Sequence, residues 1–265
     1  MSAPPELTIS LGTTDLPFHR AAAAVTRRVP EAHGHRVSSV GASPEQLFRL
    51  RARGSLYVLV SAWLPHGHDA YLSPYRHRAK VLTPLYRPRC VWAVPSYVPA
   101  YKVRRVSDLA RPSVRRLMAR SITGTDPGTG LSRLSVRVLS EYGLDRLGYS
   151  FSSCAEAEFL SRVERGLATR EWFVVRLWRP RYLTRAYGLR LLSEPRELLG
   201  TADSASPVIS EEALDQIHPD AVACLDSLYL DDDCVEEIDV LIHQQGRSPP
   251  QAADQFLSGR PGLLP

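Results

Sequence analysis

The sequence predicts an α/β fold made of two successive α/β units followed by a helical segment. Strand-like and helix-like runs alternate through the first two thirds of the 265 residues, and this alternation is typical of βαβ units around a mainly parallel sheet. From Ser210 onward the pattern is helical, and no internal repeat or low-complexity linker interrupts the chain. A chain of this length suits one large domain or two closely packed lobes.

The first unit contains two helices whose ends are marked by particular residues. One helix is predicted from Phe18 to Ala32, although Pro30 should end or distort its last turn. Another opens at Ser43, whose hydroxyl can cap it, with Pro44 at its first position. The strands predicted here cover residues 7–11, 35–40, 56–63 and 90–97.

The second unit repeats this alternation, and a helical tail follows it. Its predicted strands cover residues 120–125 and 171–178, and its predicted helices cover 131–142 and 155–168. The tail contains a long helix at 231–245 and a closing helix at 248–257. The boundaries between the units are expected at the Pro-rich segment 95–99 and near 201–208.

The charge of the chain is positive overall but unevenly distributed. The formal net charge is +5, and 31 of the 33 basic residues are arginines, almost all of them spread from Arg20 to Arg196 with only short clusters such as Arg104–Arg105. Nucleic-acid-binding proteins concentrate positive charge and aromatic residues on one face, so this dispersion argues against that class. The C-terminal part is acidic, and no run of residues is apolar enough to span a membrane.

The N-terminus shows no basic segment followed by an apolar stretch, so no secretory signal is recognisable. Either an export signal was removed and the protein is periplasmic, or it works in the cytoplasm where it is made. Four cysteines lack metal-binding spacing and are expected to be small buried thiols, although Cys224 and Cys234 could pair in an oxidising compartment.

Two tryptophans stand at comparable places in the two units. Trp63 and Trp178 each end a predicted strand and are each followed by x-Pro, which stops the strand. Ligands of open α/β sheets bind beyond the carboxyl ends of the strands, where the two rings could face each other. Indole faces attract a quaternary ammonium group, which cannot be held by conventional hydrogen bonds. The alternative is that both rings pack in the core or at a hinge.

A second group of residues suits an anion. Gly128 and Gly130 precede the helix that begins near Leu131, and a helix N-terminus presents unpaired N–H groups that suit a carboxylate. His68, five residues beyond Trp63, could add a hydrogen bond to the same anion. The alternatives are an empty turn and a surface histidine. No catalytic triad, phosphate-binding loop or metal cluster is recognisable, so neither enzymatic activity nor a cofactor is expected.

In this order, these segments resemble the substrate-binding proteins of glycine betaine/proline-betaine ABC importers. The resemblance covers roughly residues 7–257. It rests on "SAWLPHGHDAYL", on "VWAVPSYVP" followed by "VSDLA", on "DPGTGLSRLS" with "EYGL", on "VVRLWRPRYLTRAYGLRLLSEP", and on the helical "LDSLYLDDDCVEEIDVLIHQQGRSPPQAADQF".

The resemblance implies a two-lobed type II periplasmic-binding-protein fold, in which each lobe is a mainly parallel sheet flanked by helices. Lobe 1 would comprise residues 1–98 and 205–265, lobe 2 residues 99–204, and the ligand cleft would lie between them. The resemblance further implies that Trp63 and Trp178 belong to an aromatic cage around a trimethylammonium group. His68 and the backbone N–H groups of Gly130 and Leu131 would receive the carboxylate.

The sequence departs from the family pattern around the cage. Many relatives place another tryptophan just after the first strand, where this chain has Phe18 as the nearest aromatic residue and Asp15 and His19 as polar neighbours. Phe18 and Asp15 are therefore candidate ligand-binding residues. Trp92 could replace the missing ring or pack in the hinge. Arg179 and Arg181 flank the second tryptophan segment, and an arginine inside the pocket would favour an anion over a cation.

Two functional hypotheses remain at this point. The first is a monomeric receptor that binds glycine betaine, proline betaine, carnitine or a choline-like compound and delivers it to an ABC permease and ATPase. The second is a cytosolic sensor or regulatory module of the same fold with a different small ligand. Neither hypothesis involves nucleic acid, a membrane span or catalysis.

Overall fold

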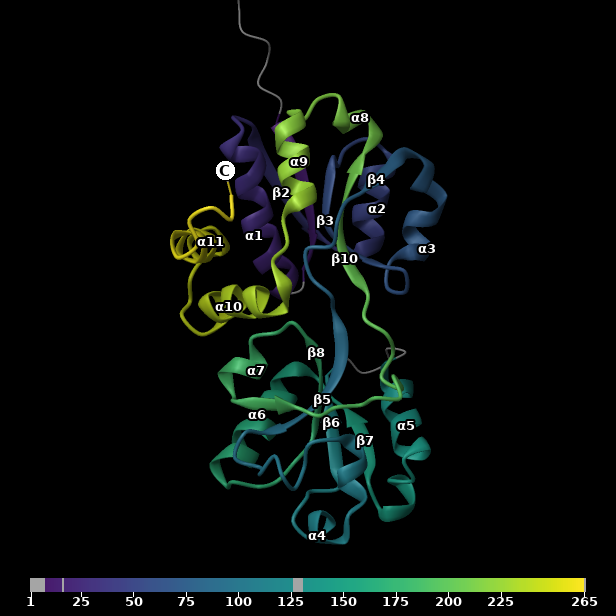
Figure 1. Cartoon of the computed structure of the whole chain (residues 1–265). Helices are drawn as coiled ribbons and strands as arrows, with labels where there is room; N and C mark the ends of the chain where they lie inside the picture. The colour runs from purple at the N-terminus through teal and green to yellow at the C-terminus, as the bar shows by residue number, and fades with distance from the viewer. Residues whose placement is uncertain (1–7, 16, 126–130, 265) are drawn as a thin grey trace, which may run out of the picture. The chain divides into compact units, whose positions relative to one another are not determined.

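The computed structural model describes residues 8–15, 17–125 and 131–264, and the chain divides into two compact units (Figure 1). Unit 1 comprises Met1–Pro88, Pro180–Tyr182 and Asp203–Pro265, and unit 2 comprises Arg89–Arg179 and Leu183–Ala202. The first boundary therefore precedes strand β5, whereas the sequence predicted it after residue 98, within the Pro-rich segment 95–99.

Unit 1 is built on a five-stranded sheet in the order β2-β1-β3-β10-β4. Strand β1 runs parallel to β2 and to β3, whereas β10 runs antiparallel to β3 and to β4. The strands are β1 (Thr8–Thr14), β2 (Arg36–Ala42), β3 (Val58–Leu64), β4 (Ala79–Val81) and β10 (Ser204–Ser210).

The helices of unit 1 pack around this sheet. Helix α1 contacts β1 and β3 and also α9, α10 and α11, while α2 contacts β1 and α3 (Figure 1). The α-helices are α1 (Pro17–Ala32), α2 (Pro44–Ala52), α3 (Asp69–Leu72), α8 (Glu211–Leu214), α9 (Pro219–Ser227), α10 (Asp231–His243) and α11 (Pro249–Ser258), and a 3-10 helix, η1, covers Ser73–Arg78.

Two expectations about these helix ends can be compared with the structure. The predicted cap of α2 is confirmed, because the Ser43 hydroxyl accepts the Gln46 N–H at 3.3 Å and Pro44 is the first helical residue. In α1, Pro30 lies inside the helix, which continues to Ala32. The lost N–H of Pro30 therefore falls in the last turn, where the helix is about to end.

Unit 2 is built on a second five-stranded sheet, in the order β7-β6-β8-β5-β9. Strand β6 runs parallel to β7 and β8, and β5 runs antiparallel to β8 and β9. The strands are β5 (Arg89–Pro95), β6 (Ser121–Gly124), β7 (Ser150–Ser153), β8 (Val175–Arg179) and β9 (Leu189–Leu191). The helices are η2 (Val106–Ala110), α4 (Pro112–Arg115), α5 (Leu131–Glu141), η3 (Asp145–Leu147), α6 (Glu156–Ala168) and α7 (Leu183–Ala186).

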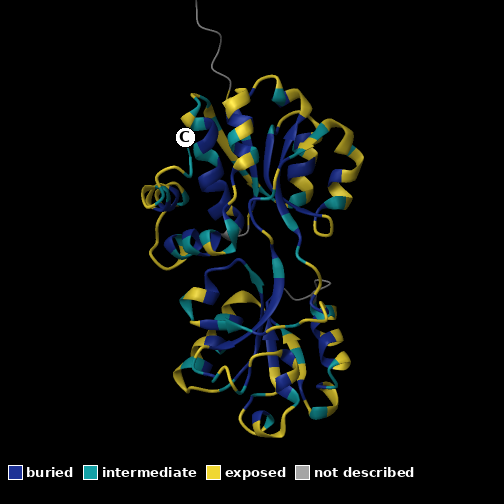
Figure 2. Cartoon of the chain, viewed as in Figure 1, coloured by how far each residue is buried: buried dark blue, intermediate teal, exposed yellow. Residues whose placement is uncertain are grey.

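The α/β class is confirmed, but the expectation of mainly parallel sheets needs correction. Among the described strands, each sheet has two parallel and two antiparallel pairings, because β10 in unit 1 and β5 in unit 2 run against their neighbours. Buried strands form the centre of each unit (Figure 2). Within the described ranges, no helix combines the length and apolar character that crossing a bilayer requires.

Candidate functional site

Trp63 lies near the end of the central strand of the unit 1 sheet. Strand β3 is buried along its whole length, and Trp63 pairs with Ala205 of β10. The indole side chain is almost fully enclosed, with 7% of the residue surface exposed. Since β1 and β3 are parallel neighbours, their carboxyl ends meet at the same edge of the sheet, so residues that follow β1 are brought near Trp63.

The turn after Trp63 is held by the buried carboxylate of Asp203, which lies 137 residues beyond His66 in the chain. One oxygen of Asp203 accepts the backbone N–H of His66 and the other accepts that of Gly67, both at 3.0 Å, and His66 Nδ1 lies 2.8 Å from Oδ1. A Cβ atom at Gly67 would lie 2.9 Å from the Cβ of Trp63, so the turn requires glycine there. Asp203 therefore fixes the backbone between Trp63 and His68.

His68 is bound to the backbone of Trp63 twice. Its own N–H donates to the Trp63 carbonyl oxygen at 2.7 Å, and its ring Nδ1 accepts the Trp63 N–H at 3.0 Å. Burial lowers the pKa of His68 to about 4, although Asp203 acts in the opposite direction. The ring is therefore neutral near pH 7 and, with Nδ1 accepting, carries its proton on Nε2. Nε2–H is thus a donor suited to an anion.

His19, from α1, completes a cluster of three rings. Its ring stacks on Trp63 with centroids 5.1 Å apart and planes inclined by 21°, and the His68 ring lies 6.3 Å from Trp63 at 24°. His19 is buried, and burial, followed by repulsion from His68 when that ring is protonated, holds the pKa of His19 well below the usual value. We call His19, Trp63 and His68 the ring cluster; both imidazoles in it are neutral at pH 7.

The other two candidates from the start of the chain are placed differently. Asp15 is exposed, and its carboxylate lies 3.1 Å from Arg20 Nη2 and next to Gly41 of β2. Phe18 belongs to α1, but its side chain lies outside the described residues. His19, which the sequence indicated only as a polar neighbour, contacts the Trp63 ring.

The two candidate tryptophans of unit 2 differ in burial. Trp178, on β8, pairs with Cys90 of β5 and is half-buried against the hydrophobic core of the unit. Trp92, on β5, has no exposed surface, and its Nε1–H donates to the Ser135 hydroxyl of α5 at 3.3 Å. The position of Trp92 is that of a core side chain, because a ligand could reach it only if the core opened.

A buried arginine that the sequence did not single out lies beside Thr125, at the end of strand β6. Arg176 of β8 has no exposed surface, donates to the carbonyl oxygen of Thr125 and lies over the Phe151 ring at 5.7 Å. A Cβ atom at Gly124 would come within 2.6 Å of Arg176 Nε, so this packing requires glycine. Gly130 lies outside the described residues, and Leu131 is the first residue of α5, with its side chain undescribed.

The arginines that flank the second tryptophan segment belong to different units. Arg179 ends β8 in unit 2, where it pairs with Arg89 and is half-buried. Arg181 belongs to unit 1 and has 5% of its surface exposed. The next residue, Tyr182, is fixed by its backbone N–H, which donates to Asp239 Oδ2 at 2.7 Å.

A family model described as the substrate binding domain of ABC-type glycine betaine transport systems matches residues 7–259 of the chain. The glycine betaine/carnitine transport binding protein GbuC of Listeria monocytogenes is 23% identical over 141 residues, which are 53% of this chain and 46% of that protein. The chain thus matches about half the length of this curated relative.

Solved structures share the fold over nearly the whole chain. The closed, liganded lactococcal OpuAC in complex with glycine betaine is 21% identical, with a TM-score of 0.71 and 97% of each chain covered. The glycine betaine/L-proline-binding protein ProX from Borrelia burgdorferi is also 21% identical, with a TM-score of 0.68, and the match covers 97% of this chain and 95% of that one. These similarities confirm the type II periplasmic-binding-protein fold.

Proposed function

The chain belongs to the family of substrate binding domains of ABC-type glycine betaine transport systems, and from this premise we propose that it captures a small quaternary-ammonium zwitterion for import. The observation that carries the proposal is the ring cluster at the end of β3, in a chain that the family model matches over residues 7–259. Glycine betaine, proline betaine, carnitine and choline-like compounds are the candidates. GbuC is named as a glycine betaine/carnitine transport binding protein, and the lactococcal OpuAC structure is a complex with glycine betaine.

In this proposal the methylated nitrogen contacts the indoles of Trp63 and Trp178, with Phe18 as a further wall. Each ring contributes about 0.5–2 kcal/mol to binding a cation. A micromolar dissociation constant requires about −8 kcal/mol, so the rings supply only part of the binding free energy. We leave Trp92 out of the cage because it has no exposed surface, and Asp15 because it pairs with Arg20.

The carboxylate would supply much of the remainder. We assign it to the Nε2–H of His68 and to the backbone N–H groups of Gly130 and Leu131. The neutral state of His68 supports this role, because a neutral imidazole donates a hydrogen bond without repelling the nearby ammonium group. The positive charge of Arg176 lies beside Thr125, and it favours binding of the carboxylate near this end of strand β6.

The protein would work outside the cytoplasm as a monomer and pass its ligand to an ABC permease and ATPase, without a catalytic step. Ligand-dependent delivery requires that the liganded form bind the permease better than the empty form does. The comparisons give no support to the alternative of a cytosolic sensor.

The proposal is tested with a panel of glycine betaine, proline betaine, carnitine and choline. We expect at least one of them to raise the melting temperature of the protein and to bind measurably in calorimetry. Trp63→Ala should abolish the effect and Trp63→Phe should weaken it, since phenylalanine keeps a smaller ring. Trp172→Ala is the matched control, because Trp172 is a half-buried indole of unit 2 outside the proposed site.

Circular dichroism of each variant separates loss of binding from loss of folding. If no compound of the panel binds the native protein, the assignment to quaternary amines is wrong, although the fold stands. Equal losses in Trp63→Ala and Trp172→Ala would remove Trp63 from the site.

A further inference from the structure

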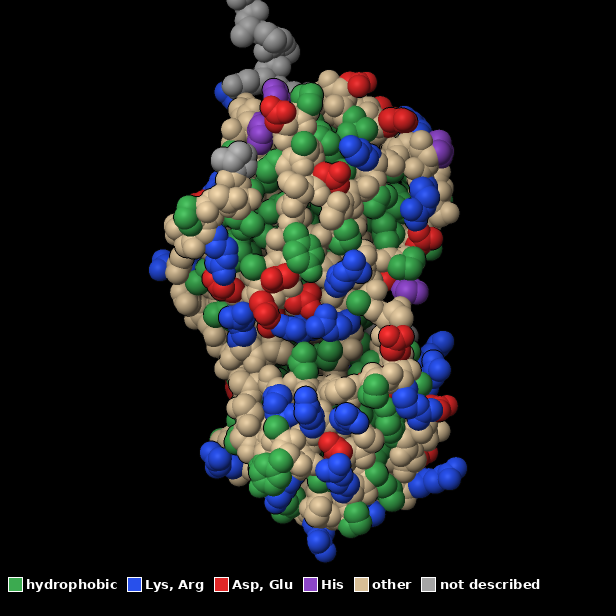
Figure 3. All heavy atoms as spheres, viewed as in Figure 1, with side chains coloured by type: hydrophobic (Ala, Val, Ile, Leu, Met, Phe, Trp, Pro, Cys, Tyr) green, Lys and Arg blue, Asp and Glu red, His purple; other side chains and the backbone are tan. Residues whose placement is uncertain are grey.

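Unit 2 carries a large excess of positive charge. Its segments contain 19 Lys and Arg residues against 10 Asp and Glu, a formal +9, whereas unit 1 has 14 against 18, a formal −4. Lys and Arg side chains spread over the visible face of unit 2, with few acidic side chains among them (Figure 3). A charge excess of this size makes unit 2 the part of the chain suited to anionic partners.

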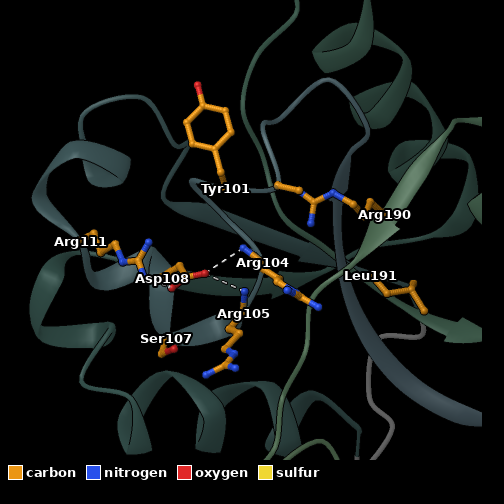
Figure 4. Close-up of a pocket in the computed structure, with 9 residues that line it drawn as sticks. Tyr101, Arg104, Arg105, Ser107, Asp108, Arg111, Arg190 and Leu191 are labelled. Atoms are coloured by element: carbon orange, nitrogen blue, oxygen red, sulfur yellow. Dashed lines mark hydrogen bonds and ion pairs between the residues drawn. The ribbon is translucent and has the colours of Figure 1, made fainter.

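Part of this excess lines a pocket between the loop before η2 and strand β9. The cavity has a volume of about 650 Å³. Its lining includes Tyr101, Arg104, Arg105, Asp108, Arg111 and Arg190, so four guanidinium groups accompany one carboxylate (Figure 4). A cavity of this size accommodates a small ligand or the headgroup of a lipid.

The single carboxylate of this pocket is already engaged. Asp108 is 6% exposed, and its Oδ2 accepts the backbone N–H groups of Arg104 and Arg105 at 2.8 and 2.9 Å. Its Oδ1 lies 2.8 Å from Arg111 Nη2. Asp108 therefore fixes the loop and pairs with Arg111. In the part of the chain that is described, no acidic side chain pairs with the guanidinium group of Arg104 or of Arg105.

Arg190 is held in place from the opposite side of the pocket. Its Nη2 donates to the carbonyl oxygens of Val98 and Val103 at 2.9 and 2.8 Å, so the side chain extends from β9 toward the loop (Figure 4). The loop is tied to the same edge, because Val106 N–H donates to the Ser193 carbonyl oxygen at 3.1 Å. Arg104, Arg105 and Arg190 are thus held in place by hydrogen bonds within the protein, without a ligand.

We propose that this arginine pocket, lined by Arg104, Arg105, Arg111 and Arg190, binds a phosphate group. Planar guanidinium groups pair with phosphate oxygens through two parallel hydrogen bonds, and several of them suit a doubly charged group better than a single carboxylate. The group comes either from a soluble phosphorylated compound or from the headgroup of an anionic phospholipid. This site is independent of the proposed zwitterion site, which involves none of these arginines.

The test uses the full chain and two probes at low ionic strength. Inorganic phosphate is titrated calorimetrically in a chloride buffer, and sedimentation is measured with vesicles of phosphatidylcholine and phosphatidylglycerol in equal parts, with pure phosphatidylcholine as reference. In the double variant Arg104→Glu/Arg105→Glu, we expect binding of the effective probe to fall about tenfold or more. The double variant Arg146→Glu/Arg165→Glu changes the charge of unit 2 equally at exposed positions outside the pocket, and it should keep most of the binding.

The outcomes distinguish the two sources. Binding of phosphate without vesicles identifies a soluble ligand, and binding of the anionic vesicles identifies a headgroup. The proposal is overturned if neither probe binds, or if both double variants lose binding equally, because the effect would then be one of net charge alone. The betaine-induced rise in melting temperature, measured on the same variants, should be unchanged, so failure of one proposal is distinguishable from failure of the other.

Discussion

Each unit contains a buried aspartate that accepts the backbone N–H groups of two consecutive residues. In unit 1, Asp203 binds the N–H groups of His66 and Gly67, and in unit 2, Asp108 binds those of Arg104 and Arg105. The same backbone contact supports different side chains: stacked aromatic rings beside the turn in unit 1, and arginines on the loop in unit 2. The contact that fixes a turn therefore does not determine which ligand its side chains can bind.

The contrast extends to the whole composition of the two units. Their sheets have the same pattern of parallel and antiparallel neighbours, yet unit 1 is formally acidic and unit 2 strongly basic. All eight histidines of the sequence fall in unit 1 and none in unit 2. The topology of a sheet therefore does not decide what its surface binds, because that depends on residues at the strand ends and loops.

The largest effect on the free energy of unfolding is expected from Trp92, the fully buried indole of unit 2. Trp92→Ala should lower the free energy of unfolding by about 3–5 kcal/mol, since it empties a fully buried site. Trp178→Ala should cost clearly less, because Trp178 is half-buried. Urea unfolding measures both. Equal losses for Trp92 and Trp178 would contradict the assignment of Trp92 to the core and of Trp178 to the ligand site.

The next effect is a pH dependence of stability that we expect in unit 1 and not in unit 2. The pKa of His68 is about 4 in the folded protein and about 6.5 in the unfolded chain, so the unfolded chain binds an additional proton between these values. The free energy of unfolding should therefore fall by about 3 kcal/mol as the pH drops from 6.5 to 4, and His19 adds to the same direction.

Hydrogen exchange, followed separately for each unit over this pH range, measures that effect. We expect protection to fall in unit 1 and the dependence to flatten in His68→Gln. Unit 2 has no histidine, so a loss of protection in unit 2 alone would contradict protonation of His68 as the cause.

A smaller effect is expected from the two aspartates themselves. Asp203→Ala and Asp108→Ala should each cost about 2 kcal/mol, because each leaves two backbone donors without their acceptor. Asp203→Ala should also remove the betaine-induced rise in melting temperature, while Asp108→Ala should keep it. If Asp108→Ala abolished betaine binding as well, the two turns would not be independent.

The smallest effect concerns the bond between Trp92 and α5. Ser135→Ala removes the acceptor of the Trp92 Nε1–H and should cost about 1 kcal/mol in the free energy of unfolding. Ser135→Thr keeps a hydroxyl and is the matched comparison. A loss well above that of a single hydrogen bond would indicate that Ser135 also supports the packing of α5.

Much of the fold could be predicted because its signals are local. The alternation of strands and helices and the cap at Ser43 are visible in neighbouring residues, and both are present in the structure. The direction of β5 and β10 was not predictable in this way, because the period of a strand is the same whichever way it runs. Those two strands account for the departure from mainly parallel sheets.

For the candidate site, residues close in sequence to Trp63 were found and distant ones were missed. His68 lies five residues beyond Trp63, and the structure connects the two by hydrogen bonds. Asp203 was missed because its partners lie 136 and 137 residues away. The arginine pocket was likewise visible only as the pair Arg104–Arg105, since pairing of β9 with β5 is needed to bring Arg190 to it.

The tryptophan fluorescence of unit 1 comes from the ring cluster. Trp63 is the single indole in the sequence of unit 1, while Trp92, Trp172 and Trp178 all belong to unit 2. Its emission therefore reports one neighbourhood, in which the His19 ring is stacked on the indole. Subtracting the spectrum of a Trp63→Phe protein isolates this signal, so the molecule contains its own fluorescent reporter of the packing at the end of β3.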